Sequence, residues 1–151
     1  MTVDGAQLRK TLEADRELAV RLRAFRGVVR VTLGPTVFDL VVDDGAVTST
    51  DPAETEPTVG VTIPTELWDL MAVEKPQVGL ECMTSAQVFG ATIDADWPTL
   101  VAPYLGAWNR IVRLGVDAAT GRHEVAVDAD PFADSDDPVG RYVRFDVDGL
   151  E

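Results

Sequence analysis

Apolar residues in the first part of the chain recur every three or four positions, the spacing typical of one face of a helix. These positions are Leu8, Leu12, Leu18, Leu22 and Phe25, with a small phase shift between the second and the third. The spacing predicts a helix over about residues 5–24. We expect Asp4 to cap it, with Gln7 completing a capping box, and Gly27 to stop it.

The pattern then changes to the apolar runs of β-strands. Strand-like runs cover residues 28–33, 37–42 and 46–50, and Gly34-Pro35 separates the first two. Asp44-Gly45 separates the last two, and such a pair predicts a tight hairpin because glycine readily adopts positive φ. The three runs therefore predict an antiparallel meander.

Two strands and two short helices are predicted in the middle of the chain. Residues 59–63 (VGVTI) read as a fourth strand and residues 90–95 (GATIDA) as a fifth. Between them, residues 64–72 predict a short helix that begins at the proline, and residues 83–89 predict another. On the first of these helices, Leu67, Leu70 and Met71 are expected to share a face, with Trp68 at its edge.

The last strong pattern is a long amphipathic helix after Asp96, its expected cap. Pro98 falls in the first turn, where its missing N–H costs nothing, and Pro103 is expected to kink the helix on the opposite side. One apolar stripe is predicted along it, formed by Trp97, Leu100, Val101, Tyr104, Leu105, Trp108, Ile111 and Val112.

Together these elements predict an α+β fold with a mainly antiparallel sheet of about five strands. We expect one domain over residues 1–116, an acidic extension over 117–140 and a strand-like tail over 141–151. The tail ends just past an Asp148-Gly149 turn signal without a second strand, as at the start of a truncated following domain. A chain of 151 residues can bury a core of its own without metals or disulfides.

Charge narrows the range of partners. The formal net charge is -13, and residues 117–151 contribute 10 acidic and 3 basic side chains. Acidity without a lysine or arginine stripe argues against nucleic acid, because phosphate repels it, and against anionic membranes. The sequence has no run long enough to span a membrane and no apolar leader. With its single cysteine, these features lead us to expect a cytoplasmic location.

Reactive groups are few, and none forms a recognised catalytic or metal motif. No G-x-S-x-G, G-x-G-x-x-G or P-loop sequence occurs, and His123 is the only histidine. Cys82 reads as a small core residue. Asp94 and Asp96 form a carboxylate pair beside Trp97, but strand and cap positions explain them without catalysis. We expect no metal, no cofactor and no catalytic residue in this chain.

In this order, the elements of residues 28–114 resemble the sterol-carrier-protein (type 2) lipid-binding family. VFDLVVDDGAV is similar to its central strand, Asp-Gly turn and next strand. VGVTIPTELWDLMA is similar to its apolar strand and short helix, and GATIDADWPTLVAPYL to its closing strand and last helix, with Ala95-Asp96 in place of a Gly-Asp turn. The resemblance implies a five-stranded sheet with helices packed on one face, enclosing an apolar tunnel for sterols, fatty acids or acyl-CoA.

The end of the chain has a looser likeness. The acidic linker followed by YVRFDVDGLE resembles the first strand of an α/β-hydrolase, and in some bacterial hydrolases a domain of this kind precedes the catalytic part. This likeness implies a covalently following or associated enzyme domain.

The leading hypothesis is non-catalytic binding of an apolar or amphipathic small molecule, such as a lipid, between sheet and helices. The expected lining residues are Phe38, Leu67, Met71, Met83, Trp97, Tyr104 and Trp108. Apolar stripes of this kind form plain core more often than ligand pockets, so an accessory or interaction domain without a ligand is the alternative. An enzyme in its own right, acting through Asp94, is the third hypothesis.

Overall fold

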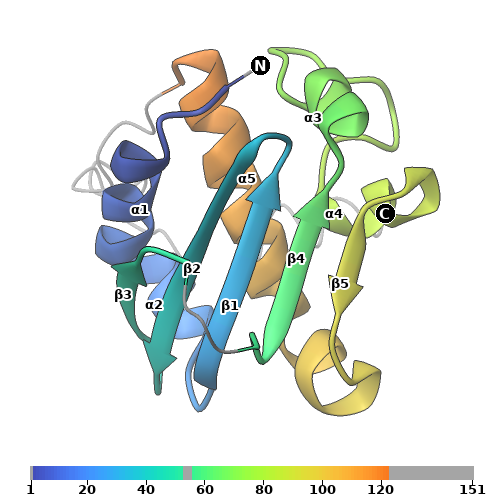
Figure 1. The fold of residues 1–151 in the computed structure, drawn as a ribbon. Helices are drawn as coiled ribbons and strands as arrows, with labels where there is room; N and C mark the ends of the chain where they lie inside the picture. The colour runs from blue at the N-terminus through green and yellow to red at the C-terminus, as the bar shows by residue number, and fades with distance from the viewer. Residues whose placement is uncertain (1, 53–55, 123–151) are drawn as a thin grey trace, which may run out of the picture.

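The structure is a computed structural model that describes residues 2–52 and 56–122, and it contains one five-stranded sheet (Figure 1). The strands are β1 (Arg26–Leu33), β2 (Thr36–Asp43), β3 (Ala46–Thr50), β4 (Val59–Ile63) and β5 (Thr92–Asp94). The helices are α1 (Gly5–Ala14), α2 (Arg16–Arg21), α3 (Thr65–Met71), α4 (Met83–Ala86) and α5 (Leu105–Thr120), with short turns η1 (Gln87–Phe89), η2 (Trp97–Val101) and η3 (Ala102–Tyr104). The predicted strand-like tail over residues 141–151 lies outside the described residues.

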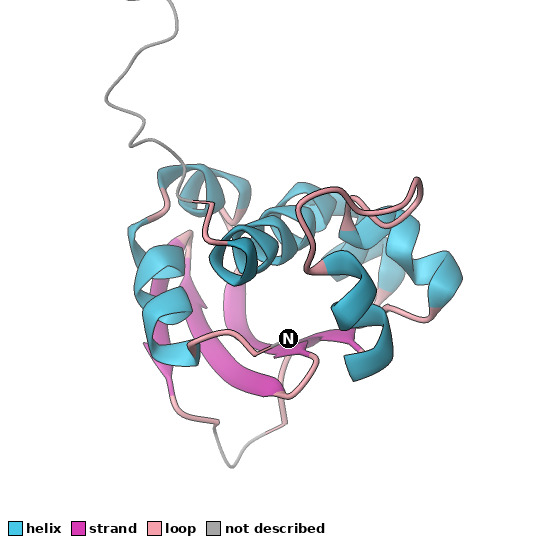
Figure 2. Cartoon of the chain, turned by 90° about the horizontal axis from the view of Figure 1, so that it is seen from above, coloured by secondary structure: helices cyan, strands magenta, loops and turns pink. Residues whose placement is uncertain are grey.

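The strand order is β3-β2-β1-β4-β5, and all pairs are antiparallel except β1 with β4. The predicted α+β class and the mainly antiparallel sheet are therefore confirmed. The helices gather on one side of the curved sheet (Figure 2), and that side holds the core. Strand alternation explains the core, since every second side chain of β4 is buried and the others are only partly covered.

The predicted hairpin between β2 and β3 is confirmed in its backbone conformation. Asp44 and Gly45 have φ values of 48° and 85°, as a type I′ turn requires at both central positions. The Asp44 carboxylate also accepts a hydrogen bond of 2.6 Å from the backbone N–H of Ala24. This bond ties the turn to the segment that leads from α2 into β1.

The single N-terminal helix predicted over 5–24 is wrong, because the chain forms two helices that break at Asp15. Asp4 caps α1 as expected, accepting from the backbone N–H groups of Ala6 and Gln7. Asp15 has extended backbone angles and caps α2 by accepting from the N–H of Glu17. The break absorbs the phase shift between the two sets of leucines, so both sets remain buried.

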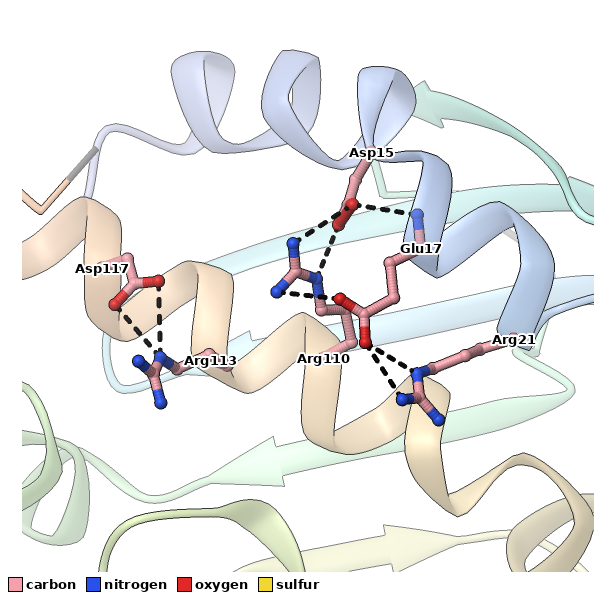
Figure 3. Close-up of polar contacts among 6 residues, drawn as sticks. All are labelled: Asp15, Glu17, Arg21, Arg110, Arg113 and Asp117. Carbon is pink, nitrogen blue, oxygen red and sulfur yellow. Dashed lines mark hydrogen bonds and ion pairs between the residues drawn. The ribbon is translucent and has the colours of Figure 1, made fainter. Parts of the chain in front are cut away.

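Asp15 also joins this break to α5 through a network of ion pairs (Figure 3). Arg110 donates to both carboxylate oxygens of Asp15, at 2.7 and 3.3 Å, and contacts Glu17 at 3.2 Å. Glu17 in turn pairs with Arg21 at 3.0 Å. The side chains of Arg110 and Asp15 are largely buried, so water screens this pair less than a surface pair. The network fixes the two N-terminal helices against α5.

We expect Asp15→Asn to lower the free energy of unfolding by about 1–2 kcal/mol, because the amide keeps the capping oxygen but loses the charge that faces Arg110. Asp15→Ala also removes the cap, and its cost should be larger by about 1 kcal/mol. Urea denaturation measures both. Asp43→Asn is the matched control, since its pair with Arg26 is exposed on both sides and should change stability by less than about 0.5 kcal/mol. Equal effects of the two asparagine substitutions would contradict this prediction.

The last helix lies where the sequence predicts it, but its first turns are not α-helical as predicted. It opens with a π-helical turn, η2, and a 3₁₀ turn, η3, before α5 begins. Pro103 explains the irregular turns, because it lacks the N–H that would bond the carbonyl of Thr99. Asp96 occupies the N-cap position, but its carboxylate accepts from the Thr99 hydroxyl and not from a backbone N–H as expected. The helix continues to Thr120, and so includes the start of the predicted acidic extension.

Candidate ligand-binding site between the sheet and the helices

The sheet contributes an entirely apolar wall on the side of the helices. Phe38 and Leu40 of β2 face inward there, beside Val29, Val31 and Leu33 of β1, and all five are buried. Asp39 lies between Phe38 and Leu40 and therefore points to the opposite face. There it forms a two-bond ion pair with Arg30 across the β1–β2 ladder, at 3.0 and 3.1 Å. The hydrogen bond to Asp39 raises the pKa of Arg30.

Helix α3 contributes a second wall, with Leu67, Trp68 and Met71 buried and Leu70 exposed. The predicted face of Leu67, Leu70 and Met71 is therefore wrong in one member, since Trp68 takes the place of Leu70. Two glycines make room for the indole. A Cβ atom at Gly34 would lie 2.7 Å from Cδ1 of Trp68, and one at Gly115 would lie 3.3 Å from its Cη2. Trp68 thus fills the space between the β1–β2 turn and α5.

Helix α4 brings Met83 into the same interior, and α5 holds α4 in place. The side-chain oxygen of Asn109 accepts hydrogen bonds from the backbone N–H and the hydroxyl of Thr84, at 3.0 and 3.1 Å. These bonds satisfy a helix-end N–H that has no partner within so short a helix. Met83, the residue before Thr84, is fully buried.

Three aromatic side chains meet at the start of α5. Phe25 contacts Tyr104 and Trp108 edge to face, with ring centroids 5.2 and 5.6 Å apart, and Tyr104 lies 6.2 Å from Trp108. The indole N–H of Trp108 donates to the carbonyl of Leu100 at 3.2 Å, so the irregular turn supplies the partner that a buried tryptophan needs. Tyr104 is only partly buried and packs against the core.

Six of the seven predicted lining residues therefore belong to one apolar interior or pack against it. Trp97 does not, since its side chain is 55% exposed at η2. Its predicted place in the buried stripe is wrong because the stripe assumed α-helical spacing from residue 97 onward. The π-helical and 3₁₀ turns rotate the start of the helix relative to α5.

Buried acidic side chains in the described part of the chain are paired with arginines. Asp39 pairs with Arg30, and Asp117 pairs with Arg113 one turn earlier on α5. Asp15, which is largely buried, pairs with Arg110 (Figure 3). The interior is formed by apolar side chains and is thus suited to apolar groups.

Cys82 departs from its predicted core position. Its side chain is partly exposed, and its sulfur lies 3.3 Å from the hydroxyl of Ser85. Burial raises the pKa of the Cys82 thiol, but hydrogen bonds with Ser85 and with the backbone at residues 84 and 85 outweigh it, so the net shift is downward. Cys82 occupies the N-cap position of α4 and takes no part in the apolar interior.

The described residues show no catalytic arrangement around the other candidate groups. Asp94 and Asp96 are both exposed, and Asp96 bonds Thr99. No group of three or more histidine, cysteine or acidic side chains that could hold a metal occurs among residues 2–52 and 56–122. None of the helices described is both long and apolar enough to span a membrane.

Two solved structures are similar to this chain in their fold. A crystal structure of sterol carrier protein 2 matches 78% of this chain and 97% of its own, with a TM-score of 0.55 at 16% identity. The chain has the sterol carrier protein 2 fold. A solution structure of a conserved hypothetical protein from Thermus thermophilus, possibly a sterol carrier protein, matches 79% of this chain and 88% of its own, with a TM-score of 0.52 at 15% identity. No family model matches the sequence, and no curated protein matches it.

The apolar interior includes two aromatic residues beyond the predicted lining, Phe25 and Trp68. The sequence pattern places Phe25 at the end of the first helix, yet it follows α2 and forms the centre of the aromatic group. Its spacing from Leu18 and Leu22 was the available signal, because it placed Phe25 with buried leucines. The sequence signal for burial of Trp68 is weaker, because the glycines that make room for it, Gly34 and Gly115, lie far from it along the chain.

Proposed function

We propose that this protein is a non-catalytic binder of an apolar or amphipathic small molecule, such as a lipid, held between the sheet and helices α3, α4 and α5. The observation that carries the proposal is an interior walled by apolar side chains on every one of these elements, within a sterol-carrier-like fold. The proposed lining is Phe38, Leu67, Met71, Met83, Tyr104 and Trp108.

The composition of this lining favours an adaptable site. Met71 and Met83 are unbranched and can change rotamer at little cost, so the interior can adjust to ligands of different shape. Burial of apolar ligand surface supplies affinity of roughly 25 cal/mol per Å² before ordering costs are subtracted. The hydroxyl of Tyr104 can hydrogen-bond a polar head group at the edge. The single cysteine supports a reducing compartment, and we propose the cytoplasm as the location.

Titration with a fluorescent fatty acid and a fluorescent sterol tests the proposal. We expect saturable, one-to-one uptake of at least one probe by the full chain. The titration is best made in a Trp97→Phe background, because Trp68 and Trp108 are buried and their emission then reports the interior alone.

The fluorescence of the two buried tryptophans should change in parallel with uptake of the probe. Absence of saturable uptake with unchanged emission would contradict the proposal. That result would favour an accessory domain, belonging to a larger enzyme such as a hydrolase, that has no ligand of its own.

A further inference from the structure

Exposed large apolar side chains are concentrated in one short section of the described chain. Five of them fall between residues 70 and 89, and we call this group the apolar patch. It consists of Leu70, Val73, Val78, Val88 and Phe89. Val78 and Val88 are 92% and 85% exposed, which is unusual for β-branched apolar residues. An exposed group of this kind marks an interaction surface more often than single scattered residues do.

The segments that carry the patch lie in one region of the fold. Its members lie on α3, on the α3–α4 connection and on η1, which are grouped beside β4 and β5 (Figure 1). A Cβ atom at Gly79 would lie 3.1 Å from the ring of Phe89, so the connection packs directly against η1. The exposed side chains of the patch are carried by turns and short helices.

The apolar patch is held outward by a fixed framework. Residues next to it in sequence, Met71, Leu80 and Met83, are buried in the core. Asn109 fixes α4, and the guanidinium of Arg122 donates to the backbone carbonyl of Glu74. The patch residues are therefore exposed because the backbone is anchored in this orientation, and not because the region lacks a core.

Charge around the apolar patch narrows the kind of partner. Residues 64–96 contain six acidic side chains and a single basic one, Lys75. Glu66, Asp69, Glu74 and Glu81 are exposed. We call these four carboxylates the acidic rim. They repel anionic lipids and nucleic acid and attract a surface whose outermost groups are cationic. The choline ammonium of phosphatidylcholine is such a group and lies at the outer edge of an otherwise apolar layer.

We propose that the apolar patch docks onto zwitterionic, phosphocholine-rich bilayers, with Val88 and Phe89 entering the headgroup region and the acidic rim facing the cholines. Exposed apolar side chains can be buried at the boundary between the headgroups and the acyl chains of a bilayer. The patch lies on the outer side of the elements whose inner side lines the proposed ligand site. Docking is measured with vesicles and without a small-molecule probe. Its outcome therefore does not depend on whether the protein takes up a ligand.

Flotation of the full chain with phosphatidylcholine vesicles tests this inference. We expect Val88→Ser combined with Phe89→Ser to weaken vesicle binding by at least about tenfold. Val37→Ser combined with Val41→Ser is the matched control, because these residues are exposed on the outer face of β2, and binding should be unchanged. Replacing a third of the lipid by phosphatidylserine should weaken binding of the wild-type chain. Circular dichroism checks that both double variants fold.

A reporter tryptophan gives a second readout. In the Trp97→Phe background, Phe89→Trp should show a blue shift of emission on addition of phosphatidylcholine vesicles, and Val41→Trp should not. Any of the following would overturn the inference: absence of binding by the wild-type chain, equal binding by the patch variant, or stronger binding to phosphatidylserine. Self-association that the patch substitutions abolish, seen by sedimentation velocity, would also overturn it and identify a second copy of the chain as the occupant.

Discussion

Trp68→Ala is expected to lower the free energy of unfolding by about 3–5 kcal/mol, the usual cost of truncating a fully buried aromatic side chain. The cost should fall at the upper end, because the indole is enclosed by glycines on two separate elements. Neither Gly34 nor Gly115 has a side chain that can move into the vacated space. Urea denaturation followed by circular dichroism measures the effect, with an unchanged m-value showing that the unfolding transition stays comparable.

Trp97→Ala is the matched control, since it makes the same chemical change at an exposed position. We expect it to alter stability by less than about 0.5 kcal/mol, as is usual for surface substitutions. A similar cost at both positions would show that Trp68 does not fill the space between the β1–β2 turn and α5 in solution.

Met71→Trp is expected to weaken uptake of an apolar probe by at least about tenfold, because the larger side chain occupies space that the ligand needs. In an interior that accommodates a ligand, the added bulk should cost less stability than the roughly 1–3 kcal/mol typical of an overpacked core. Probe titration and urea denaturation of the same protein separate the two effects.

Leu70→Trp is the control for this substitution, because it places the same side chain one residue earlier on the exposed side of α3. It should leave uptake within about twofold of the wild-type chain, a difference of less than about 0.5 kcal/mol. Loss of stability in Met71→Trp with unchanged uptake would place the ligand away from α3.

The sheet could be predicted largely from the sequence, because its signals are local. Each strand is a short β-branched or alternating run, and Asp44-Gly45 specifies the β2–β3 turn by its backbone preference alone. The parallel pairing of β1 with β4 was not predicted, since it joins segments separated by a hairpin and no local pattern encodes it.

The interior was predicted less accurately, because burial of a helical side chain depends on how its helix is rotated against the sheet. Trp68 and Leu70 exchange places through a small rotation of α3, which the glycines opposite Trp68 decide. Trp97 leaves the stripe because Pro103 disturbs the hydrogen bonding several residues before itself. The break at Asp15 depends on Arg110, a partner 95 positions away along the chain.

The parallel pairing of β1 with β4 also affects how the protein is made. During synthesis β2 follows β1 directly and can pair with one edge of it. The strand that pairs with the other edge of β1, residues 59–63, is synthesised later. At about 5–20 residues per second, the 30 residues from the end of β1 to the end of β4 take roughly 1.5–6 s to synthesise. During that time the nascent chain presents an unpaired valine-rich strand edge, a template for pairing with other chains. Slow translation or truncation before Ile63 should therefore promote aggregation, whereas truncation beyond it leaves that edge covered.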